Sequence, residues 1–399
     1  FAMPTSERER LLTRLLELPD LNSRVAVALV DVAARFRVSG TVPSLTRLMG
    51  DPSRSQELRS QAAVALAKLD AASGRAYLES IAQRDSPDAA GAFRRLCEIA
   101  HVDSVPRFLD VLEAGDATLR RSALSGLARA PLEELGDPVR DRVAAVLSRV
   151  LPDLEDLQAG IDGVVAAGKL RGQPGTSLLV RLMRDTSQAD QLRSTAAQRL
   201  GDRSSRAARA ALIEALGEDP SRQVRGAAAL ALKPQTPPAV AELLRVAQAD
   251  PDEDVRARAF IALGRGRTLE ALKPALDALR SSPDVRARVG AILSLGLLRQ
   301  PDAEAVRLLT EMLRPGRHPH ERLSAAWALG RLRDPRVLPA LVTVLNQESL
   351  RVDPRERVTA ALAGAGSGLA ALLGQLGDDV GVLMGQLPGM FRGSISAAE

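Results

Sequence analysis

Apolar residues recur along this chain at the spacing of a single helical face, each time behind an arginine. After Arg256 they stand three, four and seven positions on, at Ala259, Phe260 and Leu263, and Gly264 follows at the eighth position. Residues with this spacing lie on one side of an α-helix. The arginines that begin the same phrase are Arg59, Arg120, Arg193, Arg225, Arg256, Arg288, Arg322 and, in a poorer copy, Arg357. The pattern therefore predicts a series of similar amphipathic helices.

The spacing of these arginines gives the length of a repeat. From Arg193 onward, successive arginines stand 32, 31, 32, 34 and 35 residues apart, which is room for one pair of helices and its turns. The two earlier intervals are about twice as long, so a degenerate repeat is expected in each, at 89–99 and at 157–168. A further unit around Arg24 brings the expected number of helical hairpins to about eleven.

A first helix is expected ahead of each arginine helix, because leucine and valine pairs stand there at helical spacing, as in 42–49, 105–112, 240–246 and 337–345. A hairpin of this size cannot bury its own apolar face, so stacking on neighbours must close the core. Alanine at the third and fourth positions would let helices approach closely. Glycine at the eighth position would either end the helix in a left-handed cap or permit close packing.

These phrases resemble HEAT repeats of the short bacterial, bilin-lyase-like type, whose second helix reads Val-Arg-x-x-Ala-Ala-x-Ala-Leu-Gly. The resemblance covers roughly residues 20 to 363 and implies an all-α fold, an α-α superhelix or solenoid of about eleven hairpins. It divides the chain into an N-terminal helix or cap at 1–20, the repeats at 21–363 and a C-terminal segment at 364–399. That last segment is apolar and rich in glycine, so we expect it to cap the final repeat, with a docking or membrane-surface helix as the alternative.

The recurrent arginine has two interpretations. It could line a groove and bind an acidic partner, or it could bridge the loop aspartate of its own or the next repeat. Asp219 and Asp250 stand six residues before Arg225 and Arg256, which favours the structural interpretation. The resemblance to HEAT repeats implies the same role.

The middle of the chain is the best electrostatic candidate for a partner surface, although acidic residues are interleaved with its arginines. Trp327 joins the candidates as a contact hot spot if it is exposed. Its position, five residues behind Arg322, instead predicts core packing, since other repeats carry aliphatic residues there. The candidate partner-binding residues are Arg203, Arg206, Arg209, Arg222, Arg225, Arg256, Arg258, Arg265 and Trp327.

Catalytic chemistry finds little support in the sequence. The His318-Pro-His320-Glu321 motif resembles the His-Glu pairs with which deoxyhypusine hydroxylase, a HEAT protein, holds two irons; that family needs four pairs and this chain has one. We therefore interpret His318 and His320 as polar residues before a helix, and expect no metal, no cofactor and no catalytic residue. Cys97 lies on an apolar helical face and is expected to be buried and unreactive.

Net charge and cysteine content say little about the partner or the chemistry of this protein. The net charge is +5, but 49 acidic residues stand among 54 basic ones, which is typical of a solvated helical surface. The single cysteine excludes an internal disulfide, and no signal peptide or membrane span is evident, so the cytoplasm is expected, with a removed N-terminal signal as the alternative.

The prediction for function is a non-catalytic scaffold or adaptor that binds another protein, with an acidic surface as one option for that partner. A nucleic-acid-binding solenoid of the DNA-repair kind is the first alternative. A HEAT-type lyase is the second, although no residue constellation supports it. Oligomeric state is left open.

Overall fold

The computed structural model describes residues 5–18, 22–69, 72–83, 88–300, 302–314 and 316–332. Within these ranges all regular structure is helical, with 20 α-helices, four short 3-10 turns and no strand, so the expected all-α fold is confirmed. The predicted helix at 337–345, the poorer copy behind Arg357 and the segment 364–399 lie outside the described residues. No helix in the described part of the chain is both long and apolar enough to cross a bilayer.

The chain divides into two compact units, residues 1–196 and 197–399. The helices that begin in the first unit are α1 (Thr5–Leu16), α2 (Ser23–Arg35), α3 (Val42–Gly50), α4 (Gln56–Lys68), α5 (Ala72–Ala82), α6 (Ala89–Ile99), α7 (Val105–Ala114), α8 (Ala117–Arg129), α9 (Asp137–Val150), α10 (Leu157–Lys169), α11 (Gln173–Arg184) and α12 (Asp190–Gly201). Those of the second unit are α13 (Arg206–Glu218), α14 (Arg222–Ala231), α15 (Pro237–Ala249), α16 (Glu253–Arg265), α17 (Leu272–Ser281), α18 (Val285–Leu298), α19 (Ala303–Met312) and α20 (Pro319–Leu332). The two degenerate repeats expected from the long intervals are confirmed as α6 and α10.

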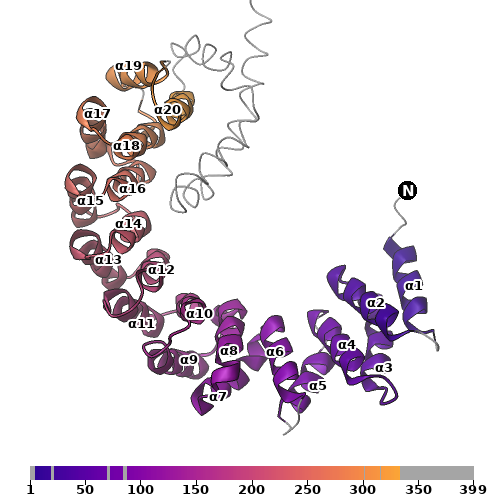
Figure 1. The fold of residues 1–399 in the computed structure, drawn as a ribbon. Helices are drawn as coiled ribbons and strands as arrows, with labels where there is room; N and C mark the ends of the chain where they lie inside the picture. Colours follow the sequence, from indigo (N-terminus) through magenta and orange to yellow (C-terminus); the bar gives the residue numbers. More distant parts are fainter. Residues whose placement is uncertain are drawn as a thin grey trace, which may run out of the picture. The chain divides into compact units, whose positions relative to one another are not determined.

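Each unit is a stack of antiparallel helical hairpins. In the second unit the first helices of the hairpins pack in the series α13, α15, α17 and α19, and the second helices pack in the series α14, α16, α18 and α20. Figure 1 shows these two rows side by side. The first unit repeats the arrangement, with α2, α4, α6, α8 and α10 as second helices in contact. Stacking of this kind buries a face that no hairpin could bury alone.

The apolar phrase forms the core, as its spacing predicts. Ala259, Phe260 and Leu263 of α16 are all buried, and so are the corresponding residues of α14 and α18. Cys97 is buried on α6, and this burial raises the pKa of its thiol, so it remains protonated and unreactive.

The glycine at the eighth position permits close packing and does not form a left-handed cap. A Cβ on Gly264 would stand 2.8 Å from Ser294 Cα of the next second helix, and a Cβ on Gly296 would stand 2.8 Å from Ala328 Cα. Neither glycine has a positive φ. The cap expected as one alternative is therefore wrong for these positions, and the close approach is confirmed.

Gly290 of α18 provides a test of this packing. A Cβ there would lie 2.7 Å from the Ala257 carbonyl oxygen of α16, so the backbone of one helix would have to move. We expect Gly290→Ala to lower the free energy of unfolding by about 1–3 kcal/mol through overpacking. Gly91, in α6, has open space at its Cβ, and Gly91→Ala should raise stability by about 0.5–1 kcal/mol. Denaturant midpoints of the two variants measure the difference, and equal shifts would contradict the close-packing role.

Candidate functional site

Six of the recurrent arginines cap the helix that precedes them, whereas the buried Arg120 Nε finds no hydrogen-bond partner among the described residues. The last carbonyl groups of an α-helix lack partners within the helix and carry partial negative charge, so a cation there is favourable. Arg59 Nε donates to Met49 O at 3.0 Å, Arg193 Nε to Met183 O at 3.0 Å and Arg322 Nε to Leu313 O at 3.2 Å. Arg225 Nη1 donates to Asp219 O at 3.0 Å, Arg288 Nη1 to Ser282 O at 2.6 Å and Arg256 Nη1 to Asp250 O. Each of these arginines thus joins the two helices of its own hairpin.

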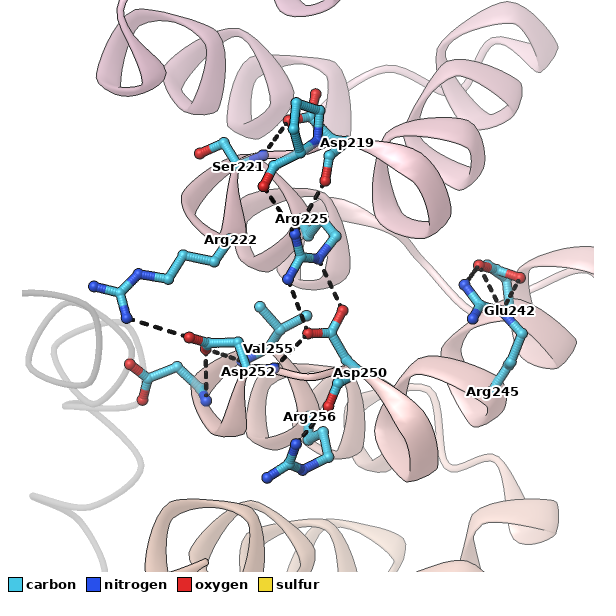
Figure 2. Close-up of polar contacts among 12 residues, drawn as sticks. Asp219, Ser221, Arg222, Arg225, Glu242, Arg245, Asp250, Asp252, Val255 and Arg256 are labelled. Atoms are coloured by element: carbon cyan, nitrogen blue, oxygen red, sulfur yellow. Dashed lines mark hydrogen bonds and ion pairs between the residues drawn. The ribbon is translucent and has the colours of Figure 1, made fainter.

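In the second unit the same arginines also bind an acid of the next repeat. Arg225 makes a bidentate pair with Asp250, with Nε to Oδ2 at 2.8 Å and Nη2 to Oδ1 at 3.0 Å. Figure 2 shows Arg225 between the Asp219 and Asp250 loops. Arg256 pairs in turn with Asp284, and Arg288 with Glu321. Hydrogen bonding to Asp250 raises the pKa of Arg225, which outweighs the effect of burial. The structural interpretation of the recurrent arginine is confirmed, and we call these three pairs the arginine ladder.

Four of the eight candidate arginines lie in the N-terminal half of second helices, beside or within this ladder. Arg222 is exposed at the start of α14 and pairs with Asp252 at 3.2 Å, while Arg225 and Arg256 belong to the ladder itself. Arg258 lies against Gly226 of the preceding second helix, and burial lowers its pKa. The side chains of Arg225 and Arg256 are already engaged within the chain.

The other four candidate arginines lie at the opposite edge of the stack. Arg265 is the last residue of α16 and stands nine residues, or about 13 Å along the helix axis, from Arg256. Arg203 precedes α13, and Arg206 and Arg209 occupy its first turn. The C-terminal ends of successive second helices are neighbours, because Gly201 lies against Ala231 as Gly264 does against Ser294. The structure therefore separates the basic middle stretch into two groups that the sequence had presented as one.

The His318-Pro-His320-Glu321 motif starts helix α20. Glu321 is buried, accepts a hydrogen bond from the His318 backbone N–H at 3.2 Å and pairs with Arg288. This arrangement is an N-terminal capping box, with His318 at the N-cap and Glu321 three residues later. Because the Glu321 carboxylate binds both the His318 N–H and the Arg288 guanidinium, its role is to stabilise the fold. Among the described residues, no group of three or more His, Cys, Asp and Glu side chains is placed to hold a metal ion.

The two histidines line an open cavity of about 440 Å³ between the N-terminal ends of α16, α18 and α20. Their rings stack at a centroid separation of 5.0 Å. Burial lowers the pKa of His320, and the charges of His318 and Arg286 lower it further. Arg286 pairs across the cavity with Asp254 at 2.7 Å. The charges around this cavity therefore partly neutralise one another.

Comparison with protein families decides the nature of the repeats. The model of the HEAT-repeat family matches residues 175–264 and 272–363. These two segments of the chain are HEAT repeats. The matched segments contain the arginine ladder, and α6 and α10, the degenerate repeats, lie before them.

Solved structures similar to this chain include Kap121p bound to Nup53p, at 14% identity and a TM-score of 0.49, with 85% of this chain and 44% of that chain covered. Importin beta matches at 14% identity and a TM-score of 0.38, covering 86% of this chain and 59% of that one. Human deoxyhypusine hydroxylase matches at 16% identity and a TM-score of 0.25, covering 75% and 97%. The chain thus spans less than half the length of the Kap121p chain. A search of curated protein sequences finds no significant match.

Within the HEAT repeats, Trp327 occupies a core position. It is 8% exposed, and its indole lies beside Gly296 of the preceding second helix and 5.1 Å from the Arg331 guanidinium. This is the packing role that its place in the repeat predicts, and the exposure that a contact hot spot requires is lacking.

Sequence reasoning missed two features of the HEAT repeats. Glu321 joins the ladder from the position directly before Arg322, where the copies behind Arg225 and Arg256 carry valine, and the His-x-x-Glu spacing of a capping box was the available signal. Arg267 and Arg299 were not selected, yet both adopt left-handed backbone, with φ of 53° and 55°. Nothing in the sequence around them marks that conformation, because Gly266 stands one position too early and adopts φ of −73°.

Proposed function

We propose that this protein is a non-catalytic scaffold that binds another protein through the surface of its HEAT repeats. The proposal rests on a difference between two groups of charged side chains: one is engaged within the stack and the other is exposed. The ladder arginines, Asp250 and Glu321 are engaged in capping and bridging, so they serve the stack, while basic residues at the opposite edge of the second unit face solvent. A surface of exposed charge on a rigid stack is suited to recognition.

Of the nine candidate residues, those at this opposite edge are the proposed partner contacts: Arg203, Arg206, Arg209 and Arg265. Arg206 and Arg265 are exposed. Arg222 is exposed as well, at the other edge, and its pair with Asp252 leaves it less available. Arg225, Arg256, Arg258 and Trp327 are proposed to contribute through the fold rather than through direct contact.

Affinity capture from the source cell tests the proposal. We expect wild-type protein to retain a protein partner that the variant Arg206→Glu, Arg209→Glu, Arg265→Glu loses. The matched control is Arg10→Glu, Arg94→Glu, Arg171→Glu, which changes net charge equally at three exposed arginines of the first unit and should retain the partner. A protein set that is identical for all three would contradict the assignment of the edge. Capture of nuclease-sensitive material alone would replace the proposal with a nucleic-acid function.

A further inference from the structure

Basic residues recur in successive loops along one edge of the second unit. These loops join the second helix of one repeat to the first helix of the next. They pack against one another, since Gly266 of one loop lies against Pro234 of the loop before it. The exposed basic residues in and beside these loops, which we call the basic edge, are Arg206, Lys233, Arg265, Arg267 and Arg299.

The residues of the basic edge are not engaged within the described part of the chain. None of the five forms an ion pair with an acidic side chain among the residues that the structure describes, although Glu270 is exposed in the same loop as Arg267. Other arginines of the same unit do find such partners: Arg222 pairs with Asp252, Arg280 with Asp277 and Arg286 with Asp254. The C-terminal ends of α14, α16 and α18 favour positive charge at Lys233, Arg265, Arg267 and Arg299, whereas Arg206 begins α13, where the helix dipole disfavours a cation.

Two of these arginines occupy a backbone conformation that disfavours them. Arg267 and Arg299 have φ of 53° and 55°, in the left-handed region where a side chain crowds the following carbonyl and glycine is the usual choice. Within the described residues, neither arginine side chain forms a hydrogen bond or ion pair that would offset this cost. At Arg267 this conformation closes the C-terminus of α16, because the Arg267 N–H donates to Gly264 O at 2.9 Å and the Thr268 N–H donates to Leu263 O at 3.1 Å. The helix ends therefore explain the backbone conformation, and the exposed charge without an acidic partner is the feature that points to a ligand outside the chain.

We propose that the basic edge binds an acidic, extended segment of a protein partner, with one carboxylate against each loop. Neighbouring helices stand about 10 Å apart, and an extended chain advances about 3.3 Å per residue, so an acid at every third residue would match successive loops. Single-stranded nucleic acid fits less well, because it is held by stacking on exposed aromatic rings. Phe260 and Trp327, the aromatic residues in the described part of the second unit, are both buried.

This inference rests on the proposed scaffold function and names the chemistry of the partner. The probe is a fluorescein-labelled peptide of about ten residues with glutamate at every third position and serine between, which spans four loops. Its lysine counterpart and a labelled DNA duplex serve as comparison probes. Fluorescence anisotropy measures binding to the full chain, and we expect the glutamate peptide alone to bind.

Three variants give the test its controls. Arg265→Glu, Arg267→Glu, Arg299→Glu should weaken binding of the glutamate peptide by about tenfold or more, because three exposed attractive charges become repulsive. Arg10→Glu, Arg94→Glu, Arg171→Glu, with the same change in net charge, should leave binding unchanged. Arg267→Gly, Arg299→Gly relieves the left-handed strain, so its thermal midpoint should be equal or higher while peptide binding is weakened. Lost binding in this glycine variant therefore cannot be attributed to unfolding.

Equal effects of the edge and control variants would overturn the inference, as would tighter binding of the DNA duplex that depends on Arg267 and Arg299. If wild-type protein fails to bind the glutamate peptide, the inference fails alone, since a partner captured through another face leaves the scaffold function standing. If no partner protein is captured at all, the scaffold function fails, whatever the peptide does.

Discussion

Asp250→Ala is expected to lower the free energy of unfolding of the second unit by about 3–5 kcal/mol, because it removes one member of a buried ion pair. The Asp250 side chain is 5% exposed and that of Arg225 is 12% exposed, so water cannot replace the lost carboxylate at the guanidinium. The same substitution removes the acceptor of the Asp252 backbone N–H, which bonds Asp250 Oδ1 at 2.9 Å. The loss should appear where α14 meets α16.

Hydrogen exchange of the α14 and α16 amides measures this loss locally, which suits a repeat array whose unfolding need not be all-or-none. The control is Glu242→Ala, which removes the surface pair between Glu242 and Arg245 and should cost less than about 1 kcal/mol. Arg225→Met combined with Asp250→Ala should recover part of the stability, since no buried charge is then left unpaired. Equal protection in the two single variants would show that the ladder does not hold neighbouring repeats together.

Leu263→Ala should cost about 2–5 kcal/mol, because it opens a cavity between layers that cannot collapse fully. Leu263 is completely buried on α16, at the seventh position of the apolar phrase. Leu269 is 55% exposed only six residues later and serves as the matched control, since Leu269→Ala should change stability by less than about 0.5 kcal/mol. Denaturant midpoints of the two variants give the comparison. A small effect at Leu263 would mean that the phrase does not form the continuous core.

The fold was predictable because the same pattern of apolar residues behind an arginine recurs in several repeats. Arg225, Arg256 and Arg288 each stand before alanines and a leucine at one helical spacing, so agreement among copies outweighs the ambiguity of any single one. The role of Asp250 also followed from sequence, since a loop acid lies within reach of an arginine one repeat away. Even α6 and α10, which lack the arginine phrase, were located by the missing periods between Arg59, Arg120 and Arg193.

The candidate site was less predictable, because sequence proximity does not say at which end of a helix a residue lies in space. Arg256 and Arg265 read as one basic stretch, yet the length of α16 carries them to opposite edges of the stack. The conformation of Arg267 was also hidden, since the left-handed cap was expected, as one alternative, at the glycine of the eighth position, Gly264. The sequence does not show which arginines are engaged and which face solvent, because this depends on how the loops of neighbouring repeats pack together.

The burial of the ladder pairs has a consequence for the behaviour of the protein in concentrated electrolyte. Mobile ions weaken attractions between solvent-exposed charges over distances beyond about 3 Å at 1 M ionic strength, but they barely reach charges enclosed by protein. Arg225 and Asp250 are enclosed, whereas Arg267 and Arg299 face the medium. A sodium chloride gradient should therefore elute a partner held at the basic edge while the stack itself keeps its helical order.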